Sequence, residues 1–157
     1  MTLPRSRRWP AAGPAARAFL LLLALVATAV PAMAAEGLTI SDARMRLVIP
    51  SRPAAGYFTL SNGTDRAQAL VGASSPACGM IMLHQSLHQN GQERMVMRKR
   101  VDVPAHGSVS FAPGGYHLMC MKPGKAMVPG HKVPVTLDFQ DGGRMTVEFL
   151  IHGIKDE

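Results

Sequence analysis

Short runs of strand-forming residues, each followed by a turn rich in glycine, proline or asparagine, recur along most of this sequence. The turns read SNGTD, QNGQ, APGG, KPGKAMVPG and DGG, and an Asn-Gly pair is a strong signal for a tight hairpin. No window between them keeps the apolar period of 3.6 residues that is typical of a helix. The sequence therefore predicts an all-β fold, either a sandwich or a Greek-key barrel.

The expected strands are spaced at the short, regular intervals of such folds. They are predicted at residues 39–49, 56–61, 67–73, 80–88, 93–101, 108–112, 116–121, 133–140 and 144–151. The sequence contains no internal repeat and no interdomain linker, so we expect a single domain.

The N-terminal segment has the pattern of a cleavable export signal. Four arginines precede an apolar run over residues 18–30, which is shorter than the roughly 20 residues needed to cross a bilayer. The run is followed by an Ala-x-Ala site at Ala32 and Ala34. We therefore expect a signal peptide over residues 1–34, a mature domain over residues 35–157 and a periplasmic location. A lipid anchor would need a cysteine at the junction, and the two cysteines stand at Cys78 and Cys120.

The charge of the mature chain excludes one class of function. The chain has 17 basic and 10 acidic residues, and removal of the four N-terminal arginines leaves 17 − 4 = 13 basic residues, a net charge of about +3. A basic isoelectric point can indicate nucleic-acid binding, but the remaining charges are dispersed. We expect a monomer with no nucleic-acid partner and no stable membrane insertion.

The segment MIMLHQSLHQNGQERMVM predicts a hairpin with soft donors on one face. If Asn90 and Gly91 form a two-residue loop, the numbers of paired residues sum to 181, so His84 lies opposite Met97 and diagonal to Met95. Strand alternation sends Leu83, Leu87 and Val96 to the core face and His84 to the other. Diagonal neighbours lie roughly 7 to 8 Å apart, within reach of an imidazole and a thioether.

A second segment, YHLMCM, repeats this combination. Alternation places Leu118 on the core face, and His117 and Met119 together on the opposite face. Imidazole and thioether donors select copper, particularly Cu(I), over the oxygen-binding ions magnesium and calcium. Zinc fits less well because its structural sites favour thiolates, imidazoles and carboxylates.

The donors also follow a recognisable spacing. His84, Met95, His117 and Met119 form the pattern H-x10-M-x21-H-x-M, and PGGYHLMCM and VPVTLDFQDGGRMTVEF flank it. This pattern is similar to the signature of the periplasmic PCu(A)C copper chaperones. The resemblance implies a cupredoxin-like β-barrel that binds Cu(I) through these four side chains at a shallow, partly exposed site.

The resemblance also implies a function and partners. Members of that family are implicated in copper delivery to respiratory oxidases, notably the copper A centre of cytochrome c oxidase, often with a thiol-bearing assembly factor. We therefore expect a metallochaperone that acts by ligand exchange, with an oxidase subunit or such a factor as acceptor, and no enzymatic activity. Two alternatives stay open, a periplasmic copper scavenger and an electron-transfer cupredoxin.

The remaining methionines and histidines have simpler interpretations. We expect Met45, Met127 and Met145 to fill the core. Another group, Met80, Met82, Met97 and Met121, could form an apolar collar around copper, and Met97 is the main rival to Met95 as a ligand. We expect His88, His106, His131 and His152 to lie at the surface.

The two cysteines favour a disulfide, because an even pair in an exported protein is commonly bridged. Strand alternation argues against this bridge unless residues 76–79 depart from regular pleating, because it places Cys78 and Cys120 on opposite faces.

Overall fold

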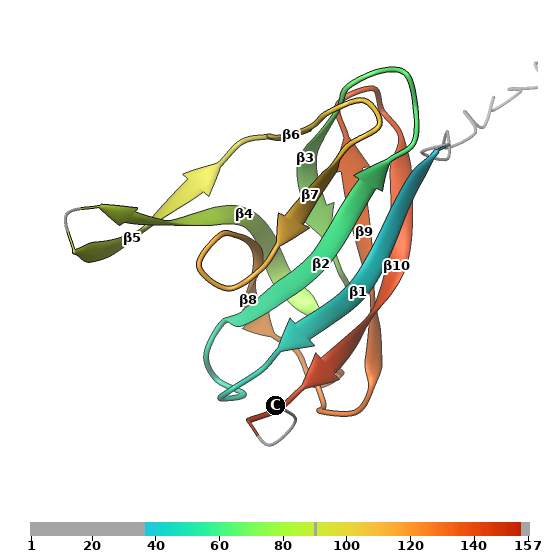
Figure 1. Ribbon diagram of the computed structural model, residues 1–157. Helices are drawn as coiled ribbons and strands as arrows, with labels where there is room; N and C mark the ends of the chain where they lie inside the picture. Colours follow the sequence, from blue (N-terminus) through green and yellow to red (C-terminus); the bar gives the residue numbers. More distant parts are fainter. Residues whose placement is uncertain (1–36, 90, 155–157) are drawn as a thin grey trace, which may run out of the picture. The chain divides into compact units, whose positions relative to one another are not determined.

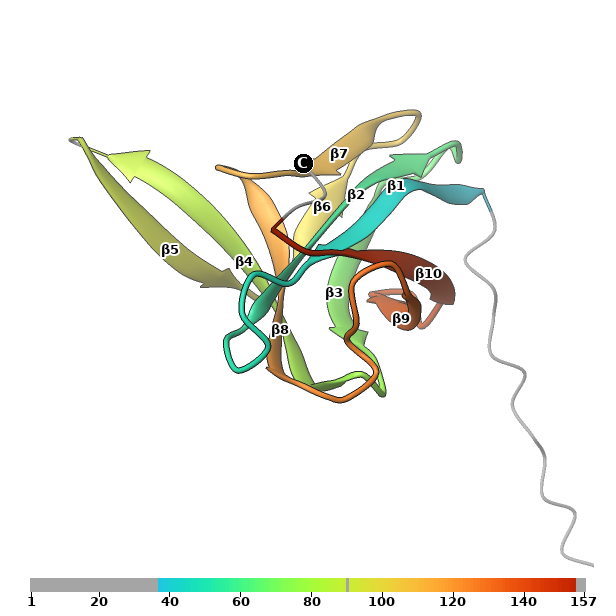
Figure 2. The same cartoon turned by 90° about the horizontal axis from the view of Figure 1, so that it is seen from below.

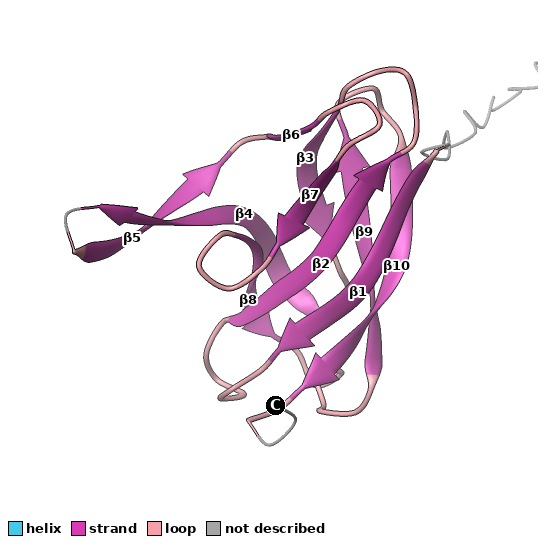
Figure 3. Cartoon of the chain, viewed as in Figure 1, coloured by secondary structure: helices cyan, strands magenta, loops and turns pink. Residues whose placement is uncertain are grey.

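The computed structural model describes residues 37–89 and 91–154, and within them every regular element is a β-strand (Figure 3). The predicted signal peptide and its cleavage site lie outside the described residues. The strands are β1 (Leu38–Arg46), β2 (Ala54–Asn62), β3 (Gln68–Ser74), β4 (Cys78–Gln89), β5 (Gln92–Arg98), β6 (Val101–Val103), β7 (Ser108–Phe111), β8 (Tyr116–Pro123), β9 (Lys132–Phe139) and β10 (Arg144–His152). The prediction of an all-β fold is confirmed.

The strands form one curved sheet in the order β5-β4-β8-β7-β2-β1-β10-β9-β3-β6, and β8 also pairs with β2. Most pairs are antiparallel, but β1 pairs with β10 and β7 with β8 in parallel. Neighbouring strands are often distant in sequence, as in Greek-key connections. This order places β4 and β8 side by side, so it brings the two donor-bearing segments together.

The expected strand over residues 93–101 is wrong in one respect, because the structure divides it into β5 and β6. Lys99 and Arg100 lie between them at a bend, and both are exposed. After the bend the chain leaves β4 and pairs with β3, where Val101 and Val103 become buried. The burial of these two valines therefore favours pairing of β6 with β3, which divides the expected single strand into the hairpin strand β5 and the barrel strand β6.

The core is built from the alternating apolar residues of the barrel strands. Phe58 stacks on Phe111 with ring centroids 4.2 Å apart, and it meets Phe149 edge-on at 5.7 Å. Such aromatic pairs add about 1 kcal/mol each beyond the burial of their area. Met45 and Met127 are buried as predicted, and Met145 is half-buried against the same core.

The β4–β5 hairpin extends away from the other strands as an arm (Figures 1 and 2). It has the predicted register, with Gln89 opposite Gln92 and His84 opposite Met97, and Gly91 has a φ of 76°. The partners of β4 on β8 extend only to Gln85 opposite Tyr116. The Ser86 nitrogen still donates to the Gly115 oxygen before β8, and after Ser86 strand β4 is paired with β5 alone.

The arm explains why one prediction of burial fails. Leu83 is buried as expected, but Leu87 and Val96 on the same side are only half-buried. Alternation orients them correctly, yet no core lies beneath the part of the hairpin that leaves β8.

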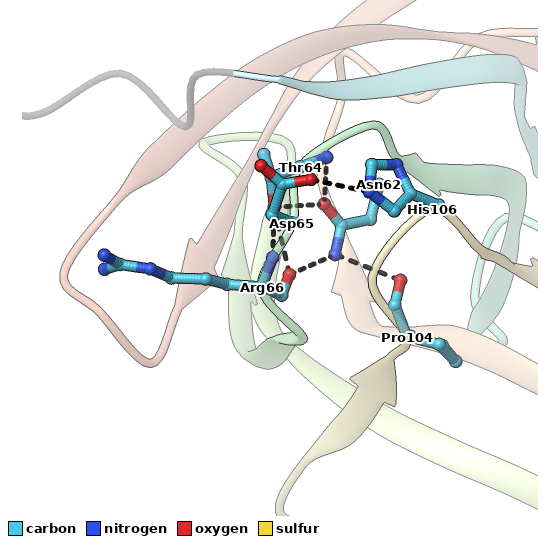
Figure 4. Close-up of polar contacts among 6 residues, drawn as sticks. All are labelled: Asn62, Thr64, Asp65, Arg66, Pro104 and His106. Atoms are coloured by element: carbon cyan, nitrogen blue, oxygen red, sulfur yellow. Dashed lines mark hydrogen bonds and ion pairs between the residues drawn. The ribbon is translucent and has the colours of Figure 1, made fainter.

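A buried asparagine at the end of β2 joins the loop after β2 to the end of β6 (Figure 4). The Asn62 side-chain nitrogen donates to the carbonyl oxygens of Arg66, Val103 and Pro104 at 2.7, 3.3 and 3.1 Å. Its oxygen accepts from the backbone nitrogen and the hydroxyl of Thr64. This network satisfies the buried amide completely, so we interpret it as structural.

The described residues contain no helix long and apolar enough to span a bilayer.

Candidate metal site

The centre of the candidate site is a pair of histidines on adjoining strands. His84 on β4 is the direct cross-strand partner of His117 on β8. Their ring centroids lie 5.8 Å apart, and the ring planes are nearly perpendicular, at 84°. Two imidazoles from segments 33 residues apart in sequence (117 − 84) therefore face one another on the side of the sheet opposite Leu83 and Leu118.

His117 is oriented by the turn that precedes β8. Its Nδ1 lies 3.2 Å from the carbonyl oxygen of Gly115, and since a carbonyl only accepts, Nδ1 donates. In the neutral ring the lone pair then resides on Nε2. A backbone carbonyl that holds Nδ1–H is a common support for a metal-binding histidine.

His117 is more enclosed than the predicted shallow site implies, with 5% of its surface exposed. The Tyr57 ring on β2 lies 6.5 Å from the His117 ring, and Arg44 in turn lies over Tyr57. Sequence reasoning missed Tyr57 as a wall of the site. Its position in β2, between the inward residues Gly56 and Phe58, was a signal that its ring points to the outer face.

His84 has an unsatisfied polar atom. Its Nδ1 is buried and has no hydrogen-bond partner among the described residues. Burial lowers the pKa of His84 below 6.5, and the neighbouring His117 lowers it further by charge repulsion. Both effects favour the neutral imidazole, which is the form that binds a metal ion.

Thioethers surround the histidine pair on the same face. Met97 is the direct partner of His84 on β5, and Met95 lies one row further along the arm, opposite Ser86. Both side chains are exposed, Met95 at 53% and Met97 at 62%. Met119 is half-buried beside His117, two residues along β8.

The structure thus brings His84, His117 and Met119 onto one patch, and register places Met95 on the same face of the arm. The described residues hold no group of three or more His, Cys, Asp or Glu side chains that could bind a metal ion. Thioethers are the donors that lie next to the two imidazoles.

The other histidines and the cysteines are not among the predicted ligands, although His88 lies on the donor face of the arm, opposite Glu93. His88, His106 and His131 are exposed as predicted, and His106 pairs with Asp65 at 2.8 Å, whereas His152 is half-buried. Cys78 and Cys120 form a disulfide with Cα atoms 5.5 Å apart.

The chain departs from regular pleating where this bridge forms. Residues 75–78 make a turn closed by a hydrogen bond from the Cys78 nitrogen to the Ser75 oxygen, and Lys122 on β8 has a φ of 50°. These irregularities remove the alternation argument against the bridge.

Comparison with known proteins gives one matching family model, described as "Putative lipoprotein LpqE-like", over residues 38–151. A relative from Leifsonia xyli subsp. xyli, described as "Putative lipoprotein Lxx21020", is 33% identical over 118 residues, which cover 74% of this chain and 70% of the relative. A second relative, the uncharacterized protein RP573 of Rickettsia prowazekii, is 31% identical over 99 residues, 60% of this chain and 53% of the relative.

Solved structures show the same fold. The Cu(I) form of DR1885 from Deinococcus radiodurans is 30% identical, with a TM-score of 0.61 and coverage of 83% of this chain and 84% of that chain. The copper-bound PCuAC domain from PmoF2 is 21% identical, with a TM-score of 0.62 and coverage of 74% and 93%. These likenesses confirm the predicted cupredoxin-like single-domain fold.

Proposed function

The chain belongs to the LpqE-like family, and from its likeness to a Cu(I)-bound structure and its facing imidazoles we propose that it is an exported copper-binding metallochaperone. Its cargo is Cu(I), and its ligands are His84, Met95, His117 and Met119. The observation that carries the proposal is the facing pair of imidazoles, each with a ring nitrogen left for a metal, bordered by thioethers on the same face.

Two of the similar structures support copper as the cargo. The similar structure of DR1885 is of its Cu(I) form, and that of the PmoF2 PCuAC domain is copper-bound. The donor chemistry agrees, because thioethers and neutral imidazoles suit the soft Cu(I) ion. A thioether also remains a donor outside the cytoplasm, where a thiol would be oxidised.

The exposure of the site suits transfer better than permanent storage. His84 is half-buried, and Met95 is 53% exposed on the arm, whereas His117 is buried. An acceptor could replace Met95 first while the enclosed His117 still holds the ion. We therefore propose that Cu(I) passes to an acceptor by stepwise ligand exchange.

The disulfide argues against the electron-transfer alternative. A blue-copper site needs a cysteine thiolate together with two histidines, and the structure joins Cys78 to Cys120. Cu(II)-loaded protein is therefore expected to lack an intense blue absorption band. Such a band in the unreduced protein would instead favour an electron carrier.

Cu(I) titration against a chromophoric chelator tests the binding site. Wild type should bind one equivalent tightly, and His117→Ala and Met119→Leu should each lower the affinity by roughly tenfold or more. Met145→Leu on β10 is the matched control, because it exchanges a half-buried thioether far along the sheet order from β8. Equal affinities for wild type and His117→Ala would contradict the proposed ligand set.

A second experiment separates delivery from scavenging. We propose a respiratory oxidase subunit or a thiol-bearing assembly factor as the acceptor and the periplasm as the location. A deletion strain should lose cytochrome c oxidase activity at low copper and recover it with the wild-type gene but not with His84→Ala. Normal oxidase activity at low copper, together with death at high copper, would instead identify a scavenger.

A further inference from the structure

A ladder of methionines continues from the histidine pair along β4 and β8. Met82 is the direct cross-strand partner of Met119, and Met80 is the partner of Met121. These pairs occupy the next two rows after His84 and His117. All lie on the face opposite the buried Leu118 and Cys120.

We propose that Met80, Met82 and Met121, here called the methionine ladder, form a second Cu(I) site made only of thioethers. This inference rests on the proposed function, because the ladder adjoins the proposed ligand Met119. Thioether sulfur is a soft, uncharged donor that favours Cu(I) over harder cations. Because it has three thioethers and no imidazole, this site is expected to bind Cu(I) more weakly than the histidine site.

Strand geometry allows the three sulfurs to converge. Side chains directly opposite one another, such as Met80 and Met121, have Cβ atoms about 5 Å apart, and the diagonal pair Met82 and Met121 about 7 Å. Methionine has three rotatable side-chain bonds beyond the backbone, so its sulfur can move several ångströms from the Cβ position. Converging thioethers can thus surround one ion without movement of the backbone.

Burial argues against simple core packing as the purpose of the ladder. Met80 is 54% exposed, and Met82 and Met121 are only half-buried. The core beneath these strands is already filled from their other face, by Leu83, Leu118 and Cys120. One exposed thioether beside two half-buried ones, on the face away from the core, is better explained by a soft ligand than by packing.

The position of the ladder suggests its use. Met82 stands two residues from His84 on β4, a separation of about 7 Å along the strand. Cu(I) held weakly there could move to the His84 and His117 site, or leave it, by exchange through Met119. The ladder would then be a staging point for the cargo.

Titration with Ag(I), an analogue of Cu(I) that air does not oxidise, tests this inference in protein labelled with ¹³C at the methionine methyls and ¹⁵N in the histidine rings. The first equivalent should shift the ring signals of His84 and His117 and the methyl signal of Met119. The second equivalent should shift the three ladder methyls. In the variant with all three ladder methionines changed to leucine, the stoichiometry should fall from two to one.

Leucine keeps the apolar surface but removes the sulfur, so an apolar collar would tolerate this change. Met145→Leu is the control and should still bind two equivalents. The ladder is refuted if the triple variant still binds two, or if the second equivalent in wild type shifts other methionines such as Met97. If the triple variant folds poorly, the methyl signals that shift in the wild-type titration still show whether the ladder methionines bind the second ion.

The two proposals fail in different ways. A first equivalent that leaves both histidines unshifted contradicts the histidine site, whatever the ladder does. A wild-type titration that shifts both histidines with the first equivalent but shows no second binding phase contradicts the ladder alone.

Discussion

Removal of the Cys78–Cys120 disulfide should cost much stability but little copper affinity. The bridge closes a loop with a sequence separation of 42. In the chain-entropy model a loop of this length restricts the unfolded state by about 4 kcal/mol at 25 °C. For a domain of this size that corresponds to a fall in Tm of roughly 15 °C.

The perturbation is best made in two ways. The double variant Cys78→Ala/Cys120→Ala leaves no thiol that could bind Cu(I), but it also removes a sulfur from the core, since Cys120 is fully buried. Reduced wild type keeps every heavy atom and isolates the cross-link. Urea unfolding of oxidised wild type, reduced wild type and the variant gives the three free energies of unfolding.

The copper site should survive this loss. The β4–β8 pairs from Met80 to Gln85 hold His84 against His117 without the bridge. We therefore expect the Cu(I) affinity of the folded double variant to stay within about threefold of wild type, by the same chelator competition. The reasoning is refuted if the free energies of unfolding of the reduced protein and of the variant both lie within about 1 kcal/mol of the value for oxidised wild type. A tenfold loss of affinity would show that the bridge positions the histidines.

Three further predictions concern the site and the barrel. Because burial and His117 lower the pKa of His84, the unfolded chain binds this proton at a higher pH than the folded chain, so the free energy of unfolding of the metal-free protein should fall as the pH drops below 6.5. The Cu(I) affinity should be constant above that pH and weaken below it. Urea unfolding checks the first expectation and chelator competition the second, each at pH 7.5 and pH 5. Met95→Leu should lower Cu(I) affinity roughly tenfold and Met97→Leu much less, and the reverse order in the titration would make Met97 the ligand. Asn62→Ala should cost about 3 kcal/mol in urea unfolding, because it removes a buried amide that donates to the carbonyl oxygens of two loops and accepts from Thr64, while Cu(I) affinity stays unchanged. A loss below about 1 kcal/mol would show that other donors or water replace the amide.

Local pattern was enough to predict the β4–β5 hairpin. The Asn-Gly turn and strand alternation together set the register, and His84 lies opposite Met97 as expected. The same alternation separated the outer His117 and Met119 from the core residue Leu118. These features depend on residues that are close in sequence.

Non-local pairing could not be predicted in this way. Nothing in either segment specifies that β4 lies next to β8, nor that His84 and His117 are direct partners. For the same reason the enclosure of His117 by Tyr57 and the incomplete burial of Leu87 were missed. Copper coordination by His84, Met95, His117 and Met119 rests on donor chemistry and spacing and stays a prediction.

Strands β4 and β8 divide two tasks between their faces. One face supplies Leu83, Leu118 and Cys120 to the core, and the other carries the imidazoles and thioethers. Substitutions of the thioethers on the donor face should therefore alter metal binding at small cost to folding, because those side chains lie outside the core.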